Sequence, residues 1–188
     1  MGRWKPDGRR RLQDAALKLY AERGFAEVTA AAVAERAGLT ERTFFRHFPD
    51  KKEILFGDEE ALRDTFVAAV AAVPVDATPY EATLAGLKAL TGALQPSRER
   101  LVLRTRIIRQ SPELRERELV KLAAWAAALT TILCERGLGP ADAVFAAETA
   151  TTTFRVAFER WTAEPLVDDA LFELVQEGFT AVERFLRR

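Results

Sequence analysis

Residues 41–47 hold the side chains best suited to bind another molecule. This stretch combines two guanidinium groups, a hydroxyl, an aromatic ring and the only histidine of the chain, namely Arg42, Thr43, Phe45, Arg46 and His47. Guanidinium and hydroxyl groups donate hydrogen bonds to phosphate oxygens and to the edges of bases. The residue types in this segment therefore predict contact with a nucleic acid.

Two short helices are expected to present these side chains. Residues 30–37 and 41–47 are predicted helices joined by a tight turn at Gly38, because glycine reaches positive φ at little cost. Thr29 and Thr40 precede the two helices and are suited to cap their N-termini. A pair of short helices joined in this way is typical of a helix-turn-helix, whose second helix enters the major groove of DNA.

A longer helix is predicted to precede this pair. Apolar residues over 7–23 follow the spacing of one buried helical stripe, and Gly24 is the expected left-handed stop. The helix-turn-helix should then be held together by its inward apolar side chains, Val33, Ala37, Leu39, Phe44 and Phe48. The side chains of 41–47 listed above remain on the outward face.

The segment from Thr29 to Phe48, TAAAVAERAGLTERTFFRHF, followed by PDKKEIL, resembles the TetR family of transcriptional regulators. The resemblance covers about residues 9–56 and is specific, since it fixes many positions at once. It implies base contacts from Arg42 and Thr43. It also implies phosphate contacts from five further residues, Thr29, Thr40, Phe45, His47 and Lys51. Phe45 stands where the family usually has tyrosine, so a phenolic hydrogen bond to phosphate is absent.

Two sets of residues can each be interpreted in two ways. Taken alone, His47 is more often a surface or packing residue, but its place after Thr-Phe-Phe-Arg favours a DNA contact. Arg9, Arg10 and Arg11 are either a solvated helix end or, with basic residues before them, an arm that reaches the minor groove.

The remainder of the chain is also predicted to be helical. Further helices are expected at about 51–72, 79–94, 97–110, 112–136, 140–163 and 167–187. The fold class is therefore all-α with about nine helices: a three-helix helix-turn-helix head and a helical bundle body. The expected domains are 1–56, which binds DNA, and 57–188, which senses a ligand and dimerises.

Two apolar stripes in the body could face either this chain's own core or a second copy. Small residues recur at helical spacing around Ala143 and Ala147, and the last helix carries Phe172, Val175 and Phe179 on one face. The resemblance implies a homodimer joined by the last two helices. We therefore expect these residues to form a dimer interface, above all those of the last helix.

Hydroxyl groups cluster unusually in a helix of the body. Thr149, Thr152 and Thr153 share one helical face, which predicts either a ligand pocket or hydroxyls bonded to the preceding turn. Expected partners in such a pocket are the side chains of Phe66, Arg104, Ile107 and Trp125. The ligand would be an unidentified small-molecule effector.

The composition and the absence of certain motifs limit the classes of protein that this sequence could encode. Residues 1–55 hold 12 Lys and Arg against 8 Asp and Glu, whereas the other residues hold 16 against 20, so the head is the more basic part. No nucleophile–base pair, zinc-ligand spacing or phosphate-binding glycine loop occurs, which argues against an enzyme, a metal site or a cofactor. No apolar run is long enough to cross a membrane.

The prediction is a cytoplasmic bacterial regulator, associated with the nucleoid when bound. It should bind a palindromic double-stranded DNA operator as a homodimer, most often as a repressor, and release it when the effector binds. The rival hypothesis is a helical ligand-binding or structural protein whose helix-turn-helix no longer reads DNA.

Overall fold

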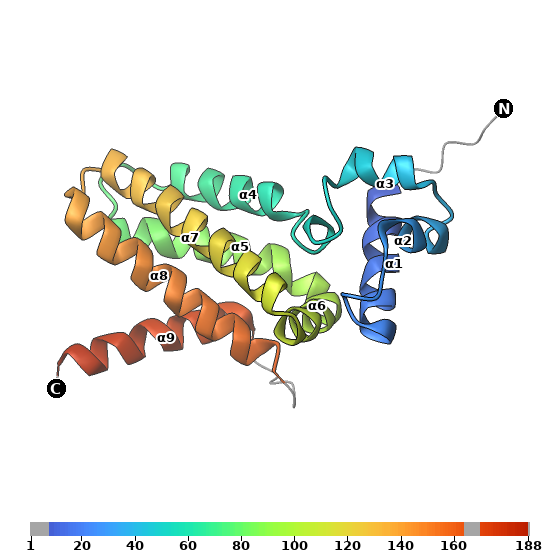
Figure 1. Ribbon diagram of the computed structural model, residues 1–188. Coiled ribbons are helices and arrows are strands. Elements are labelled where there is room, and N and C mark those ends of the chain that lie inside the picture. The colour runs from blue at the N-terminus through green and yellow to red at the C-terminus, as the bar shows by residue number, and fades with distance from the viewer. Residues whose placement is uncertain (1–7, 164–169, 188) are drawn as a thin grey trace. The chain divides into compact units, whose positions relative to one another are not determined.

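The computed structural model describes residues 8–163 and 170–187 of the 188-residue chain (Figure 1). All regular elements within these residues are helical, so the predicted all-α class is confirmed. Their nine α-helices are α1 (Gly8–Arg23), α2 (Ala30–Arg36), α3 (Glu41–His47), α4 (Glu59–Ala71), α5 (Pro79–Leu94), α6 (Arg98–Gln110), α7 (Pro112–Glu135), α8 (Pro140–Trp161) and α9 (Leu171–Leu186).

The chain folds into two compact units. The first consists of Met1–Glu59 and Glu99–Arg115, and the second of Glu60–Arg98 and Glu116–Arg188. The first unit thus contains almost all of α6 and the first turn of α7, so a single division after residue 56 does not describe the packing. The assignment of DNA binding and ligand sensing to separate domains stays a prediction.

Local sequence signals set the helices of the helix-turn-helix as expected. The hydroxyl of Thr29 accepts a hydrogen bond from the Ala32 amide at 3.1 Å, and that of Thr40 accepts one from the Thr43 amide at 3.2 Å. Gly38, in the turn between α2 and α3, has φ +64°. Each cap satisfies an amide that the helix itself leaves without a partner.

Apolar burial holds these short helices in place. Leu12 and Tyr20 of α1 lie in one cluster with Phe44, Phe48 and Ile108, and none of the five is more than 1% exposed. Burying one such side chain contributes about 1.5–3 kcal/mol. Seven-residue helices such as α2 and α3 are unstable in isolation, so their packing against α1 stabilises them.

The expected long helix over 51–72 is wrong in its first turns. The chain forms a 3-10 turn at Glu53–Leu55, capped by Asp50, and α4 begins only at Glu59. Gly57 interrupts the helix, and glycine is a poor helix former. A Cβ there would lie 2.7 Å from both an Arg9 guanidinium nitrogen and the Phe48 ring, so the site tolerates only glycine without movement.

Close approach at small residues organises the second unit. A Cβ on Gly86 of α5 would lie 2.6 Å from the Phe66 ring of α4, and one on Gly178 of α9 would lie 2.6 Å from the Thr153 methyl of α8. Helices α8 and α9 run side by side (Figure 1). None of the helices in the described part of the chain is long and apolar enough to span a membrane.

Candidate nucleic-acid interface

The recognition helix α3 has the two faces that the sequence predicts. Phe44 and Phe48 are buried, with ring centroids 5.8 Å apart. On the opposite face Arg42 and Arg46 are exposed, and Phe45 is 51% exposed. An exposed phenylalanine beside two arginines is suited to contact a sugar–phosphate backbone or a base methyl group.

Threonine hydroxyls at the starts of α2 and α3 can still donate a hydrogen bond to an acceptor on another molecule. The exposed Thr29 hydroxyl accepts a bond from its own helix, which leaves its proton to donate elsewhere. The hydroxyls of Thr40 and Thr43 lie 3.0 Å apart, so one of their two protons is used between them and the other is left. The predicted contacts of all three threonines with DNA are compatible with this geometry.

His47 lies at the end of α3 and is partly buried. Desolvation by burial, followed by the nearby charges of Arg46 and Arg9, lowers the pKa of His47 from its ordinary 6.5. The imidazole is therefore neutral at pH 7 in the free chain. A neutral ring can donate one hydrogen bond to phosphate, and an approaching phosphate would raise its pKa again.

Lys51 makes contacts within the chain that the sequence did not indicate. Its ammonium donates to the carbonyls of Phe25, Ala26 and Val28 at 2.9, 3.2 and 3.2 Å, and lies 4.3 Å from the Phe25 ring centroid. An ammonium has three N–H groups, so these three bonds use them all. The phosphate contact expected for Lys51 stays a prediction, and it would require one of these bonds to be given up.

Tyr20 contacts the backbone of Lys51. Its hydroxyl donates to the Lys51 carbonyl at 2.8 Å. Burial, and secondarily the charge of Asp50, raises the pKa of Tyr20 well above its ordinary value, so the phenol remains a neutral donor. Together Tyr20 and Lys51 fix the loop between α1 and α2 against the end of the helix-turn-helix.

Arg9 and Arg11 make contacts within the chain that neither alternative expected, and the contact with the minor groove stays a prediction. The Arg11 guanidinium donates to the Ala37 carbonyl next to the Gly38 turn. Arg9 donates to the carbonyls of His47 and Gly57. Both side chains therefore brace the helix-turn-helix from within the first unit. Basic residues before α1 lie outside the described residues.

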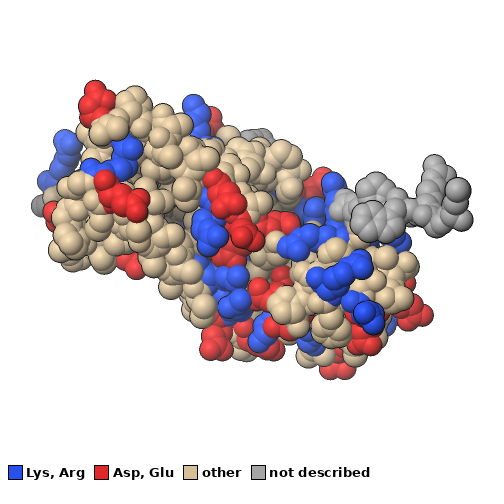
Figure 2. All heavy atoms as spheres, turned by 90° about the horizontal axis from the view of Figure 1, so that it is seen from above, with Lys and Arg blue, Asp and Glu red and all other residues tan. Residues whose placement is uncertain are grey.

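Charges of both signs are intermingled on the face drawn in Figure 2, where basic side chains lie among acidic ones. The first unit also holds ion pairs between surface side chains, such as Arg36–Glu22 at 3.0 Å and Lys52–Glu113 at 2.8 Å. The candidate interface is therefore argued from individual groups on α3 and not from a basic surface.

The residues expected to form a ligand pocket are divided between the two compact units. Phe66 and Trp125 pack edge to face in the second unit, with ring centroids 5.8 Å apart. Arg104 and Ile107 belong to the first unit, where Arg104 donates to the Leu55 carbonyl at 2.7 Å and Ile107 is 2% exposed within the core. The common ligand pocket expected from the sequence stays a prediction.

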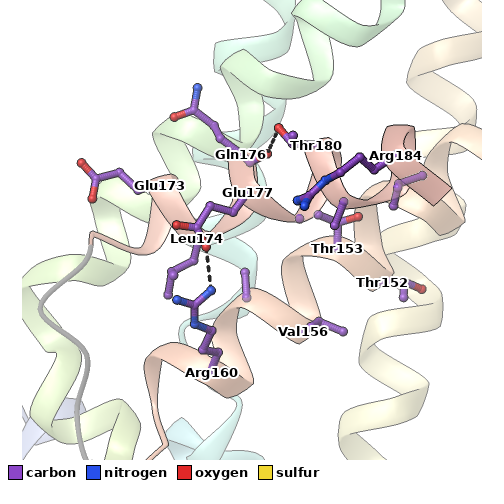
Figure 3. A pocket seen from close by; sticks show the side chains of 14 residues that line it. Thr152, Thr153, Val156, Arg160, Glu173, Leu174, Gln176, Glu177, Thr180 and Arg184 are labelled. Atoms are coloured by element: carbon purple, nitrogen blue, oxygen red, sulfur yellow. Dashed lines mark hydrogen bonds and ion pairs between the residues drawn. The ribbon is translucent and has the colours of Figure 1, made fainter. Parts of the chain in front are cut away.

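Thr152 and Thr153 do line a hollow, an open groove between α8 and α9 (Figure 3). Val156 and Gly178 share this groove, and the ion pair Arg160–Glu177, at 2.6 Å, crosses it. Thr149 lies one helical turn before Thr152 on α8 and is partly buried, but it does not line the groove. The predicted ligand role of the threonines remains a prediction.

Part of the expected dimer interface is wrong. Ala143, Ala147 and Val175 are 0% exposed within the single chain, so they face its own core and cannot contact a second copy. Phe172 and Phe179 are partly buried, and Phe179 packs edge to face on Tyr80 at 5.4 Å. Periodicity identified the buried stripes, but it could not tell which neighbour covers them. The exposed apolar side chains of α8 and α9 lie elsewhere, at Val144, Phe145, Val156, Phe185 and Leu186.

A capped helix-turn-helix with arginines, threonines and an exposed aromatic ring on its second helix defines a DNA-binding protein. The model of the family described as bacterial regulatory proteins, tetR family, matches residues 12–57. Over 185 residues the chain is 26% identical to the Mycobacterium tuberculosis transcriptional regulator MftR, which is assigned to mycofactocin biosynthesis; the match covers 91% of this chain and 93% of that protein.

Solved structures share the fold over nearly the whole chain. FadR from Thermus thermophilus in complex with lauroyl-CoA has a TM-score of 0.59 at 22% identity, with 93% of each chain covered. FadR from Bacillus subtilis in complex with stearoyl-CoA has a TM-score of 0.62 at 19% identity, with 92% of this chain and 96% of that one covered. These comparisons support the chain as a regulator of the tetR family, whose model matches its helix-turn-helix.

Proposed function

We propose that this regulator binds a palindromic operator as a homodimer through α3 of each copy, and that it represses transcription until a small molecule binds. The observation that carries this proposal is the exposed face of α3, where Arg42, Phe45 and Arg46 project from a helix fixed from behind by Phe44 and Phe48. Arg42 and Thr43 are the proposed base readers. The threonine hydroxyls and His47 supply phosphate contacts, and we assign the chain no catalytic step.

The test of this proposal is selection of DNA by the purified protein. Genomic fragments that it retains should share an inverted repeat, because a two-fold dimer reads two half-sites. Replacing Arg42 by alanine should then weaken binding by about 1–3 kcal/mol and relax the preference at one base position. A chain that retains no fragment above a random pool, or an R42A variant that keeps full selectivity, would favour the rival helical protein that reads no DNA.

A second copy is the proposed occupant of the exposed apolar face of α8 and α9. Phe145 is 74% exposed and Val156 is 52% exposed, and with Thr152 they recur at spacings of seven and four residues along one side of α8. An apolar stripe of this kind on a helix is suited to pair with its symmetry mate. Phe145→Asp should therefore produce monomers in sedimentation at micromolar concentration. Leu119→Asp, at an apolar residue of α7 that is 63% exposed, is the matched control and should remain dimeric.

Acyl-CoA thioesters are the class of effector to test first. Because the two FadR structures hold lauroyl-CoA and stearoyl-CoA, these acyl-CoA thioesters are the first probes to use. An effector releases DNA only if it binds the two conformations with unequal affinity. Thr152→Val keeps the shape of the groove and removes a hydroxyl. A dimer that still binds DNA but responds less to the probe would assign Thr152 to the ligand, whereas an unchanged response would remove Thr152 from the ligand site.

A further inference from the structure

Arg9 joins three segments that are far apart in the sequence. From the first turn of α1, its guanidinium donates to the His47 carbonyl at 3.3 Å and to the Gly57 carbonyl, 38 and 48 residues away. The guanidinium carbon lies 4.7 Å from the centroid of the Phe48 ring, and Nε lies 4.0 Å from the Asp58 carboxylate. One side chain thus contacts the end of the recognition helix and the connection that leads into α4.

The backbone at Gly57 is shaped around this side chain. A Cβ at that position would lie 2.7 Å from an Arg9 nitrogen and 2.7 Å from the Phe48 ring, closer than any real contact. The absence of a side chain lets the Gly57 carbonyl meet the guanidinium beside the aromatic ring. The Arg9 guanidinium therefore contacts the backbone at the break between the 3-10 turn and α4.

We propose that Arg9 is a positioning residue for DNA recognition. It holds the C-terminal end of α3 against the Gly57 and Asp58 connection, so that a displacement of this connection also displaces the recognition helix. This inference rests on the proposed reading of DNA by α3. Arg9 would thus couple the start of α4 to α3, the helix that contacts bases.

Only arginine has the geometry for this role. Its planar guanidinium carries five N–H groups directed along different lines, and it stacks on aromatic rings. A lysine ammonium is a compact point charge that could meet one carbonyl, but not both carbonyls while lying over the Phe48 ring. The conservative variant R9K therefore keeps the charge and removes the coupling.

Salt dependence separates positioning from direct phosphate contact. The probe is a DNA duplex that the wild-type protein selects from a random-sequence pool, and affinity is measured over a series of salt concentrations. R9K and R9Q should both weaken binding roughly tenfold, about the effect of one lost hydrogen bond to a charged group, with an unchanged salt slope. Wild-type affinity in R9K, or a slope reduced by about one in R9Q, would overturn the proposal in favour of a phosphate contact.

Arg23→Gln is the matched control, since it removes the same charge from the exposed other end of α1. It should leave the affinity within about twofold of the wild type. A loss equal to that of R9Q would mean that the net charge of α1, and not the Arg9 contacts, sets the affinity. That result would also overturn the proposal.

A second readout does not depend on DNA. Amide hydrogen exchange at Phe48 and at Glu59 should accelerate together in R9K, while amides of α5 in the second unit keep their protection. G57A should produce the same pattern, and the R9K/G57A double variant should exchange no faster than either single variant, because both remove one contact. Independent, additive effects would contradict the coupling. If the wild type selects no DNA, the proposed function fails, but the exchange experiment still decides whether the coupling exists.

Discussion

The two compact units of this protein use the same kinds of contact in different places. In the first, Arg9 and Lys51 donate to backbone carbonyls that lie 23 to 48 residues away, at the end of α3, in the connection to α4 and in the loop after α1. In the second, Arg136 donates in the same way to the carbonyl of Pro74, in the connection after α4. Close approach at glycine occurs in both units, at Gly57 in the first and at Gly178 in the second. Directed hydrogen bonds fix loop positions individually, whereas packing at small residues fixes only which helices approach closely. The difference is that the directed bonds of the first unit meet around the helix-turn-helix, where they help to hold α3 in one orientation.

The largest effect is expected from the apolar core behind α3. Phe44→Ala removes a ring that is 0% exposed and should lower the free energy of unfolding by about 3–5 kcal/mol, measured by chemical denaturation. The neighbouring residue is the control, since Phe45 is 51% exposed and its replacement by alanine should cost no more than about 0.5 kcal/mol. Equal losses in both variants would mean that the two faces of α3 are not distinct.

Lys51→Ala tests the directed contacts of the first unit. It removes three hydrogen bonds from an ammonium to carbonyls and should lower the free energy of unfolding by about 1.5–3 kcal/mol. Lys52→Ala breaks an exposed ion pair to Glu113 and should cost less than about 1 kcal/mol. Unchanged stability in Lys51→Ala, together with a salt slope of DNA binding reduced by about one, would return Lys51 to the role of a phosphate contact.

Gly178→Ala tests the close packing of the second unit. The new methyl would lie 2.6 Å from the Thr153 methyl, so we expect a loss of about 1–3 kcal/mol in unfolding free energy. Thr153→Ser removes the obstructing methyl and should restore part of the stability in the double variant. Without such rescue, the close approach of α8 to α9 at this point would not be the source of the loss.

The smallest effect concerns the single histidine. The pKa of His47 in the folded chain lies below its ordinary 6.5, so the unfolded chain binds more protons as pH falls through that range. The stabilisation is present above pH 6.5 and is lost as pH falls through the lower, folded pKa. Denaturation curves of wild type and His47→Gln between about pH 5 and 7.5 should therefore diverge towards acid, with the variant less sensitive. Parallel curves would contradict the lowered pKa.

Much of the first unit could be predicted because its signals are local. Thr29 and Thr40 cap the helices they precede, Gly38 adopts the positive φ expected of its turn, and Phe44 and Phe45 lie on the faces that periodicity assigns. Each of these features depends on residues within about one helical turn. The outward side chains of α3, which form the candidate site, could be predicted from the same local signals.

Contacts between distant segments were decided only by the tertiary structure. No spacing in the sequence shows that Arg9 meets Gly57 or that Lys51 meets the loop after α1. Helical periodicity likewise shows that Ala143 and Ala147 are buried, but not whether the same chain or a second copy buries them. A local pattern specifies the conformation and the apolar face of an element. The partner of that face depends on how the whole chain packs.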